Sequence, residues 1–514
     1  MGVFSGHVAC CLMLLQNIVP IIALPYTDVP QYFMENPYTR RDLSVPEIQQ
    51  ELGKLLSNGS LIFGPSDPAW KNATERWNTY LKPDIEVVVE PAQESDISTI
   101  VKYCNQNSID FLAYNRGHGS TTTLSSFKGM QIDLSQLSAV TIQPDGKSVW
   151  LQGGAWGRNV INTLWDQGYV TSTGSSGCPG VVGPALGGGH GRYEGLHGLI
   201  SDNFINLNVV LADGSTVRVN KTSYSDLFWA MQGAGHNFGI VSSLQLNIYP
   251  KELDTWHYHN YVWSQDKLET VFGELNKFHN NGNTPVRMGV NFGQVSLMPS
   301  VNETEAVLAW SFAYAGPSAD AEKLLKPFND IEAISSESGD VPYPGILAAQ
   351  GTDVGSPSCS DNPYGGSVAG LQTYNITTER RIYNTFVERA KSDPELFANA
   401  RVYYEGYSME AVRAVDPAST AFPQRDIFHI VFFSAVMQEG SEDQVHEWAN
   451  EIRDLWNAGQ PGRRPTTYLN YAIGDESLEA LYGYEPWRLE RLRGLKAKYD
   501  PHNRFRFYNP IVKE

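Results

Sequence analysis

Cysteine is scarce in this chain: the sequence of 514 residues contains five, and Cys10 and Cys11 lie in an apolar stretch near the N-terminus. The other three, Cys104, Cys178 and Cys359, are too few and too widely spaced for the disulfide framework of a small secreted domain. An odd number of cysteines in an exported chain indicates one thiol with a special role. Cys104 and Cys359 are a possible disulfide pair.

Basic residues are also in short supply, since 38 Lys and Arg face 56 Asp and Glu, for a formal net charge of -18. The averaged surface field repels phosphate backbones and anionic lipid headgroups, which excludes nucleic acid as a partner. Solubility is the ordinary interpretation of such an acidic surface.

The sequence lacks the usual signatures of metal and dinucleotide sites. It contains no HxxxH, no CxxC and no GxGxxG after a strand, and no carboxylate or thiol completes a ligand spacing around His190 and His197. We therefore expect no metal site and no Rossmann-type nucleotide site.

Only one long hydrophobic run is present, from Val8 to Leu24, and it ends in small Ala23 before Pro25. This pattern predicts a signal peptide over residues 1–23, with an uncleaved membrane anchor as the alternative. After cleavage, no stable membrane association is expected. Five acceptor sequons agree with a secreted or endomembrane-lumenal glycoprotein, at Asn58, Asn72, Asn220, Asn302 and Asn375.

The remaining chain is long enough for two or more packed units, with 41% hydrophobic and 11% aromatic residues. Residues 86–115 predict a strand, a helix capped by Ser95 or Asp96, and a second strand. The helical spacing of the apolar positions makes Cys104 a core residue rather than a reactive one. Shorter strands with glycine-rich turns follow, and this mixed α+β region closes near Pro250.

A different pattern runs from residue 251 to about 465. Long strands such as VLAWSFAYAG and DIFHIVFFSAVM alternate with helices such as SADAEKLLKPFNDI and QVHEWANEIRDLW, which predicts a second α+β unit. Residues 335–345 and 355–366 are polar and rich in Gly, Ser and Pro, and we expect surface loops there.

Two glycine-rich segments carry candidate chemistry. YNRGHGSTTT (114–123) follows a predicted strand, so its backbone N–H groups can face a pyrophosphate, with positive charge from Arg116. GSSGCPGVVGPALGGGHGRYEGLHGL (174–199) is dense in glycine yet holds a Cys-Pro step and apolar residues, which favours a packed ligand wall over a flexible loop. Taken alone, a histidine flanked by glycines in a turn is more often structural.

Together these segments reveal a resemblance. RGHGS, the 174–199 segment, DLFWAMQGAGHNFGIVSSLQL, YLNYAIGDES and YDPHNRF resemble, in order, the berberine bridge enzyme-like flavoprotein oxidases of the vanillyl-alcohol oxidase superfamily, and most of all fungal secondary-metabolite members. The resemblance implies an α+β fold. A PCMH-type FAD-binding domain would comprise residues 24–82 and 83–250, and a substrate-binding domain with an antiparallel sheet covered by helices would span 251–465. A BBE-like segment, 466–514, would return to the FAD domain.

The resemblance also implies how FAD is held: a bicovalent attachment through His118 to the 8α-methyl carbon and through Cys178 to the 6-position. Imidazole and thiolate are both nucleophiles suited to an electron-poor ring. The other implied cofactor-binding residues are Arg116, Gly117, Gly119, Ser120, Thr121, Val181, Gly183, Gly188, Gly189, His190 and Ile240. Val181 stands where members that use molecular oxygen carry Val.

For catalysis, the YxNY motif of the family falls on Tyr468 to Tyr471, and Tyr471 is the implied base. A tyrosine has an ordinary pKa near 10, so this role requires nearby positive charge or a hydrogen-bond donor. The alternative is a core aromatic. Plant relatives carry Glu or Gln on the pocket-facing strand where this chain offers Val431, and His429, two residues earlier on the same strand face, is a substitute base or a packed core residue.

The expected function is an FAD-dependent oxidase that makes hydrogen peroxide while it oxidises an alcohol or drives the oxidative cyclisation of a secondary-metabolite intermediate. An oligosaccharide oxidase is one alternative, since Trp and Tyr stack on both kinds of substrate. A non-catalytic flavin-binding glycoprotein is the other. The oligomeric state is open.

Overall fold

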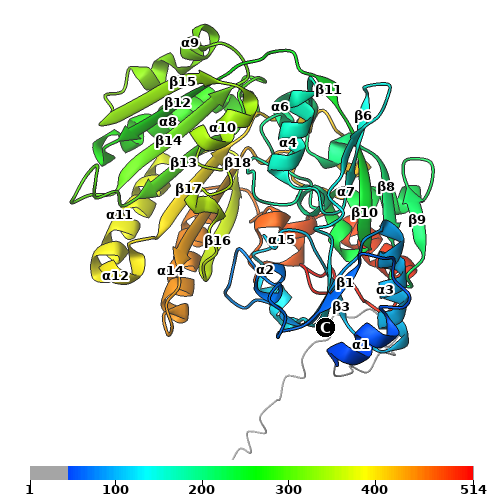
Figure 1. Ribbon diagram of the computed structural model, residues 1–514. Coiled ribbons are helices and arrows are strands. Elements are labelled where there is room, and N and C mark those ends of the chain that lie inside the picture. Colours follow the sequence, from blue (N-terminus) through cyan, green and yellow to red (C-terminus); the bar gives the residue numbers. More distant parts are fainter. Residues whose placement is uncertain (1–43, 513–514) are drawn as a thin grey trace, which may run out of the picture.

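The computed structural model describes residues 44–512, whose strands form three main sheets (Figure 1). The predicted signal peptide, with Cys10 and Cys11, lies outside the described residues. In the part of the chain that is described, no helix has the length and apolar character needed to cross a membrane.

The first sheet contains both strands that were predicted within residues 86–115, and the predicted helix packs against it. Its strand order is β1 (Leu61–Phe63), β2 (Asp84–Glu90), β4 (Lys128–Asp133) and β3 (Phe111–Tyr114), with β4 parallel to both neighbours. Helix α3 (Glu94–Gln106) buries Cys104 against this sheet, as predicted. The cap prediction is wrong, because Gln93 is the N-cap and the Asp96 carboxylate accepts its backbone N–H in a capping box.

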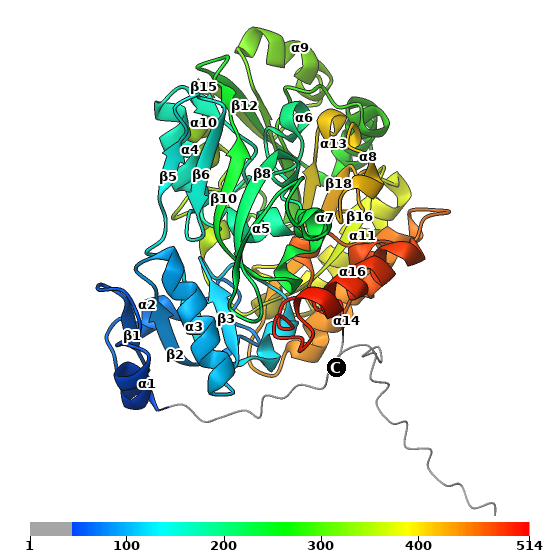
Figure 2. The ribbon, with the colours of Figure 1, turned by 90° about the vertical axis from the view of Figure 1, so that its right-hand side faces the viewer.

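The second sheet is antiparallel and shares its core with the C-terminal segment. Its order is β5 (Val140–Ile142), β6 (Ser148–Gln152), β10 (Ile240–Asn247), β8 (Phe204–Val210) and β9 (Thr216–Val219). Helix α16 (Pro486–Tyr499) lies beside α7 (Ser225–Ala234), as Figure 2 shows, and its apolar residues join the core under β8 and β10. The C-terminal end of the chain therefore packs into the core of the second sheet.

The third sheet has seven strands, and all of its pairings are antiparallel. Its order is β15 (Ser335–Val341), β12 (Trp256–Trp263), β14 (Val307–Tyr314), β13 (Asn291–Ser296), β17 (Arg401–Gly406), β18 (His429–Val436) and β16 (Tyr364–Leu371). Helices α8 (Leu268–His279), α9 (Ser318–Asn329), α11 (Ile376–Ser392) and α14 (Glu442–Ala458) bury one face of the sheet in a single core. The other face is turned towards the first two sheets (Figure 1).

One predicted loop is an element of this sheet. Residues 335–341 form the edge strand β15, and α10 (Tyr343–Ala349) follows directly. The polar sequence misled the loop prediction because an edge strand is solvated along most of its length.

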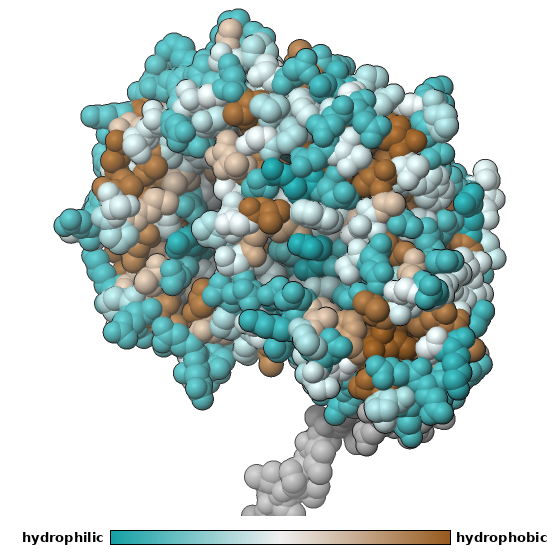
Figure 3. All heavy atoms as spheres, viewed as in Figure 1, coloured by the Kyte–Doolittle hydropathy of each residue, from teal (hydrophilic) through white to brown (hydrophobic). Residues whose placement is uncertain are grey.

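Shorter elements connect the three sheets. They are α1 (Val45–Glu51), α2 (Trp70–Ala73), α4 (Gly157–Asp166), β7 (Tyr169–Val170), α5 (Val182–Leu186), α6 (Glu194–His197), β11 (Tyr249–Pro250), α12 (Pro394–Phe397), α13 (Glu410–Arg413) and α15 (Leu478–Tyr482). On the face in Figure 3, hydrophobic residues gather in separate patches within a mainly hydrophilic surface.

Candidate active site

The RGHGS turn directly follows β3 and has unused donors. Among the described residues, none of the backbone N–H groups from Arg116 to Thr121 has a hydrogen-bond acceptor. Gly117 has a φ of 66°, and a Cβ there would lie 2.6 Å from the carbonyl oxygen of Glu75, so only glycine fits. Such a run of free N–H groups suits an anionic group.

His118 lies in this turn beside an aromatic ring. Its imidazole stacks on Trp77 with the ring centroids 5.9 Å apart, and no hydrogen bond to a described residue occupies either ring nitrogen. Burial, reinforced by the charge of Arg116, lowers the pKa of His118 to about 4. The imidazole is therefore neutral and nucleophilic at neutral pH.

The second glycine-rich segment packs tightly at one end and opens at the other. Val181 is buried, and its backbone N–H donates to the carbonyl of Ala155 at 3.0 Å. Gly188 and Gly189 have φ values of 103° and 85°, which favour glycine. A Cβ on Gly183, in contrast, would meet no atom of the described residues within 4 Å. Open space beside Gly183, with the free donors of the RGHGS turn, fits a bound dinucleotide.

The YxNY motif joins these two segments. The Asn470 side chain donates to the carbonyl of Pro184 at 2.8 Å and to the hydroxyl of Tyr468 at 2.6 Å. The residue that follows the motif contacts the RGHGS turn, because the hydroxyl of Ser120 donates to the carbonyl of Ala472. Three predicted motifs from distant parts of the chain therefore meet at one place.

Tyr468 and His190 form the inner wall of this meeting point. The Tyr468 hydroxyl accepts the backbone N–H of His190 at 3.2 Å, and the His190 Nδ1 lies 3.0 Å from the Glu194 carboxylate. All three residues are buried. These hydrogen bonds hold the rings of Tyr468 and His190 in place. Tyr468 in turn orients Asn470, whose amide donates to its hydroxyl.

Tyr471 meets a carboxylate that the sequence analysis missed. Its hydroxyl donates to Oε1 of Glu405 at 3.0 Å, and the hydroxyl of Tyr407 donates to Oε2 at 2.6 Å. Burial raises the pKa of Glu405 to about 7, although both hydrogen bonds act in the opposite direction. Burial and the charge of Glu405 also raise the pKa of Tyr471 well above its usual value. A base role for Tyr471 was expected to need a nearby positive charge or hydrogen-bond donor. The structure instead places a proton acceptor, Glu405, beside its hydroxyl.

The placement of His429 is a correction. Val431 was expected on the pocket-facing side of the strand, with His429 on the same face as a substitute base or a packed core residue. Val431 instead joins the core under the helices, and His429 stacks on Tyr374 at 4.1 Å, so the packed alternative is the one that the structure supports. Burial, with nearby His279, lowers the pKa of His429 well below its usual value, and neither of its ring nitrogens has a hydrogen-bond partner within residues 44–512. His429 is a core residue on the wrong face of β18 for a base.

Strand register explains the error. Glu405 pairs with Ile430 across β17 and β18, and both side chains point to the face that carries Tyr471. The alternation of side chains along a strand determines which residues share a face, but not which of the two faces is covered by helices and which carries the candidate active site. A buried-strand pattern interrupted by one carboxylate, as in RVYYEGY, was the available signal for Glu405.

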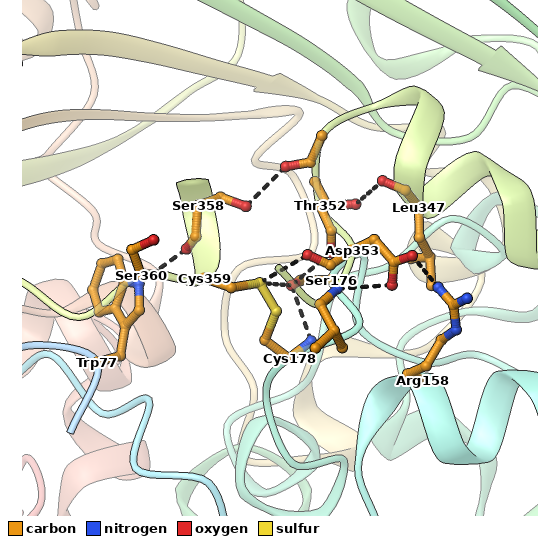
Figure 4. The surroundings of a disulfide bond; sticks show 12 residues. Trp77, Arg158, Ser176, Cys178, Leu347, Thr352, Asp353, Ser358, Cys359 and Ser360 are labelled. Atoms are coloured by element: carbon orange, nitrogen blue, oxygen red, sulfur yellow. Dashed lines mark hydrogen bonds and ion pairs between the residues drawn. A yellow bond between two sulfur atoms is a disulfide. The ribbon is translucent and has the colours of Figure 1, made fainter. Parts of the chain in front are cut away.

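Cys178 is bonded to Cys359, as Figure 4 shows. The suggested pairing of Cys104 with Cys359 is therefore wrong, and Cys104 is a free, buried thiol whose pKa burial raises to about 12. A sulfur in a disulfide cannot also bond to a flavin carbon, so the disulfide and the predicted tether are alternative states of Cys178. The loop that contains Cys359 also contacts the indole ring on which His118 stacks, because the carbonyl of Ser358 accepts the indole N–H of Trp77 at 2.9 Å.

The other predicted residues lie in varied settings. Ile240 begins β10 and is buried in the core beneath α3. Asn58 and Asn72 are exposed and Asn302 is half-buried. The side-chain amides of the other two sequon residues, Asn220 and Asn375, donate hydrogen bonds within the protein.

Comparisons with known proteins identify the family of the chain. Residues 85–220 match the "FAD binding domain" family model, and residues 467–512 match "Berberine and berberine like". The chain is 51% identical over 512 residues to the FAD-linked oxidoreductase iacH of Pestalotiopsis fici, a match that covers 98% of this chain and 99% of the relative. It is 52% identical over 478 residues to anuG of Penicillium roqueforti, also an FAD-linked oxidoreductase, covering 92% and 94%.

A solved structure shares the fold. The glucooligosaccharide oxidase of Acremonium strictum, described with a 6-S-cysteinyl, 8α-N1-histidyl FAD, superposes with a TM-score of 0.74 at 20% identity, covering 91% of this chain and 98% of that one. The chain belongs to the berberine bridge enzyme-like family of FAD-linked oxidoreductases, and its cofactor is FAD.

Proposed function

We propose that this protein is an FAD-dependent oxidase that oxidises an alcohol, or drives the oxidative cyclisation, of a secondary-metabolite intermediate and reduces oxygen to hydrogen peroxide. The substrate would bind between the flavin and the face of the third sheet that carries Glu405. The observation that carries the proposal is the hydrogen bond from Tyr471 to the buried Glu405.

The proton path follows from that hydrogen bond. The oxygen of Tyr471 accepts the proton of the substrate hydroxyl while the proton of Tyr471 passes to Oε1 of Glu405. A carboxylate with a pKa of about 7 can take up that proton at neutral pH, whereas an isolated tyrosine cannot. Bound FAD supplies the redox chemistry by accepting the hydride from the substrate carbon.

The wall around Tyr471 supports an apolar substrate. Phe432 meets the Tyr471 ring edge-on at 5.5 Å and stacks on Tyr403 at 4.5 Å, and Phe292 and Ile430 belong to the same apolar cluster. Such a surface recognises an aromatic or polycyclic molecule by area rather than by hydrogen bonds to many hydroxyls. The relatives that are half identical are named as FAD-linked oxidoreductases, and the oligosaccharide oxidase shares the fold alone.

We further propose that His118 bonds to the flavin and that Cys178 forms the second attachment in the chain whose Cys178–Cys359 disulfide is open. Only a free thiolate at Cys178 can add to the ring. The disulfide would then belong to chains that carry no flavin at Cys178. The free N–H groups of the RGHGS turn would hold the pyrophosphate, and Val181 would leave oxygen access to the ring.

The proposal includes export, which the exposed sequons Asn58 and Asn72 support. Glycans on the secreted protein would establish that route.

The decisive experiment is anaerobic mixing of the purified holoenzyme with a panel of aromatic and polycyclic alcohols. Loss of the oxidised flavin absorbance, with recovery and peroxide release in air, is the expected result. Fast turnover of cello- or chito-oligosaccharides alone would favour a sugar oxidase, and no bleaching across the whole panel would favour a non-catalytic flavin-binding protein.

A further inference from the structure

A second cluster of functional side chains lies away from the candidate active site, on the helix-covered face of the third sheet. His257 and His259 alternate with half-buried residues of the opposite face on β12 and point to the same side as Tyr261 and Trp263 of the helix-side core. Glu322 reaches them from α9, which packs over this strand. The proposed oxidase chemistry uses none of the three.

The three side chains converge on one point. Nε2 of His257 and Nδ1 of His259 lie 2.7 Å and 2.8 Å from the same oxygen, Oε1 of Glu322. All three candidate ligand atoms lie within 4.8 Å of one another. Around a tetrahedral zinc ion with ligand distances near 2.1 Å, neighbouring ligand atoms lie about 3.4 Å apart. A small withdrawal of Glu322, which is partly exposed, would open that space.

His257 is in an unusual position, because it faces a carboxylate at both ring nitrogens. Its Nδ1 lies 2.7 Å from Oδ1 of Asp340, its direct neighbour on β15, while Nε2 faces Glu322. A neutral imidazole carries only one proton, and ionised carboxylates only accept hydrogen bonds. The second nitrogen therefore needs either an additional proton or a metal cation.

The surroundings favour the cation. Two carboxylates, Glu322 and Asp340, face the two histidines, and a divalent ion would balance both charges while both imidazoles stay neutral. A histidine that binds a metal through one nitrogen commonly donates its other N–H to a carboxylate, and Asp340 stands in that position. Asn329 fixes the second oxygen of Glu322 at 2.6 Å, and the ring of His259 stacks on Tyr261 at 4.0 Å.

We propose that His257, His259 and Glu322 bind a divalent transition-metal ion of the zinc class, which ties helix α9 to the edge of the third sheet. Two imidazoles and one carboxylate suit Zn²⁺ and related ions better than Ca²⁺ or Mg²⁺, which prefer oxygen ligands alone. No metal site was expected from the sequence, because the two histidines lie outside the glycine-rich segments, as HYH (257–259) on a strand.

The test is titration of ZnCl₂ into tag-free, full-length holoenzyme that has been treated with a chelator and dialysed. Calorimetry should show one saturable site per chain, and zinc should raise the melting temperature. His259→Gln and the nearly isosteric Glu322→Gln should abolish this binding. Asp340→Asn should weaken it by about 10–100-fold, as is usual for an outer partner of a ligating histidine.

His446→Gln is the matched control, because it removes another half-buried histidine of the same unit that lies outside the cluster. This variant should bind zinc as the wild type does. The inference is overturned if wild type shows no saturable zinc binding, or if Glu322→Gln binds zinc as tightly as wild type. Neither readout depends on turnover, so failure of the proposed oxidase function would leave this test intact.

Discussion

The hydroxyl of Tyr471 lies 3.0 Å from a carboxylate oxygen of Glu405, although 66 residues separate them in the chain. The second oxygen of Glu405 accepts the hydroxyl of Tyr407 at 2.6 Å, so two tyrosines occupy both oxygens of one buried carboxylate. Neutral phenols hydrogen-bond the charged form and partly offset its loss of water. A buried group whose pKa is raised into the neutral range is a candidate general base.

This arrangement predicts a pH dependence. Glu405 must be ionised to accept a proton and its pKa is about 7, so kcat/KM should rise with pH through about 7 and level off above. Glu405→Gln should remove this rise and slow anaerobic flavin reduction by at least about a hundredfold, the scale of losing a general base. Stopped-flow absorbance measures both quantities. An unchanged pH profile in Glu405→Gln would contradict the role.

The two tyrosines should respond differently to substitution. Tyr471→Phe breaks the proton path, so flavin reduction should fall by at least about a hundredfold. Tyr407→Phe removes only a hydrogen bond that lowers the pKa of Glu405, so its profile should move to higher pH with the plateau rate retained. Equal effects of the two substitutions would indicate a merely structural pair.

The attachment of the cofactor can be read on a denaturing gel by flavin fluorescence. With two tethers, His118→Ala and Cys178→Ala should each keep a fluorescent band, and only the double variant should lose it. Because the Cys178–Cys359 disulfide competes for one sulfur, Cys359→Ser should increase the fluorescent fraction in the His118→Ala background.

Thiol labelling separates the two states of Cys178. In fluorescent wild-type chains denatured without reductant, an alkylating reagent should label Cys359 as well as Cys104. If Cys359 is unlabelled and still linked to Cys178 in those chains, the flavin is held by His118 alone and the double tether is refuted.

Oxygen reactivity provides a third prediction. Val181 is 1% exposed and lies two residues before Gly183, where a Cβ would meet open space, and by the proposed role of Val181 a longer side chain there should obstruct the approach of oxygen to the ring. Val181→Leu should slow reoxidation in air by at least about tenfold, an effect of about 1.4 kcal/mol on the barrier, without changing anaerobic reduction. Val182→Leu is the neighbouring control. Identical reoxidation of both variants would remove Val181 from the oxygen path.

Patterns between residues close in sequence predicted many of the helices and strands. They did not predict contacts that depend on how distant parts of the chain pack together. The helical spacing around Cys104 and the alternation in VLAWSFAYAG identified α3 and β14 because each pattern depends on neighbours a few residues apart. Which face of β18 carries His429 depends on how the whole sheet meets the first two, and no local pattern encodes it. The same holds for the Cys178–Cys359 bond, which joins residues 181 positions apart.

The C-terminal segment provides a prediction on stability, because Lys496 on α16 is fully buried. Its Nζ donates to Asp500 at 2.7 Å and to the carbonyls of Asn237 and Phe505, each at 2.8 Å, and thereby joins α16 to the segment around Asn237 and to the chain that follows the helix. Removing one partner leaves the Asp500 carboxylate buried and uncompensated, so Lys496→Ala should lower the free energy of unfolding by about 3–5 kcal/mol.

Lys498, two residues later on the same helix, is the matched control. It pairs with Asp226 at the surface, where such pairs contribute about 0–1 kcal/mol, so Lys498→Ala should change stability little. Denaturant unfolding of both variants measures the difference. If Lys496→Ala were no more destabilising than Lys498→Ala, the buried pair would not be what holds the C-terminal helix against the core of the second sheet, and apolar packing of Leu492 and Leu495 would have to do so alone.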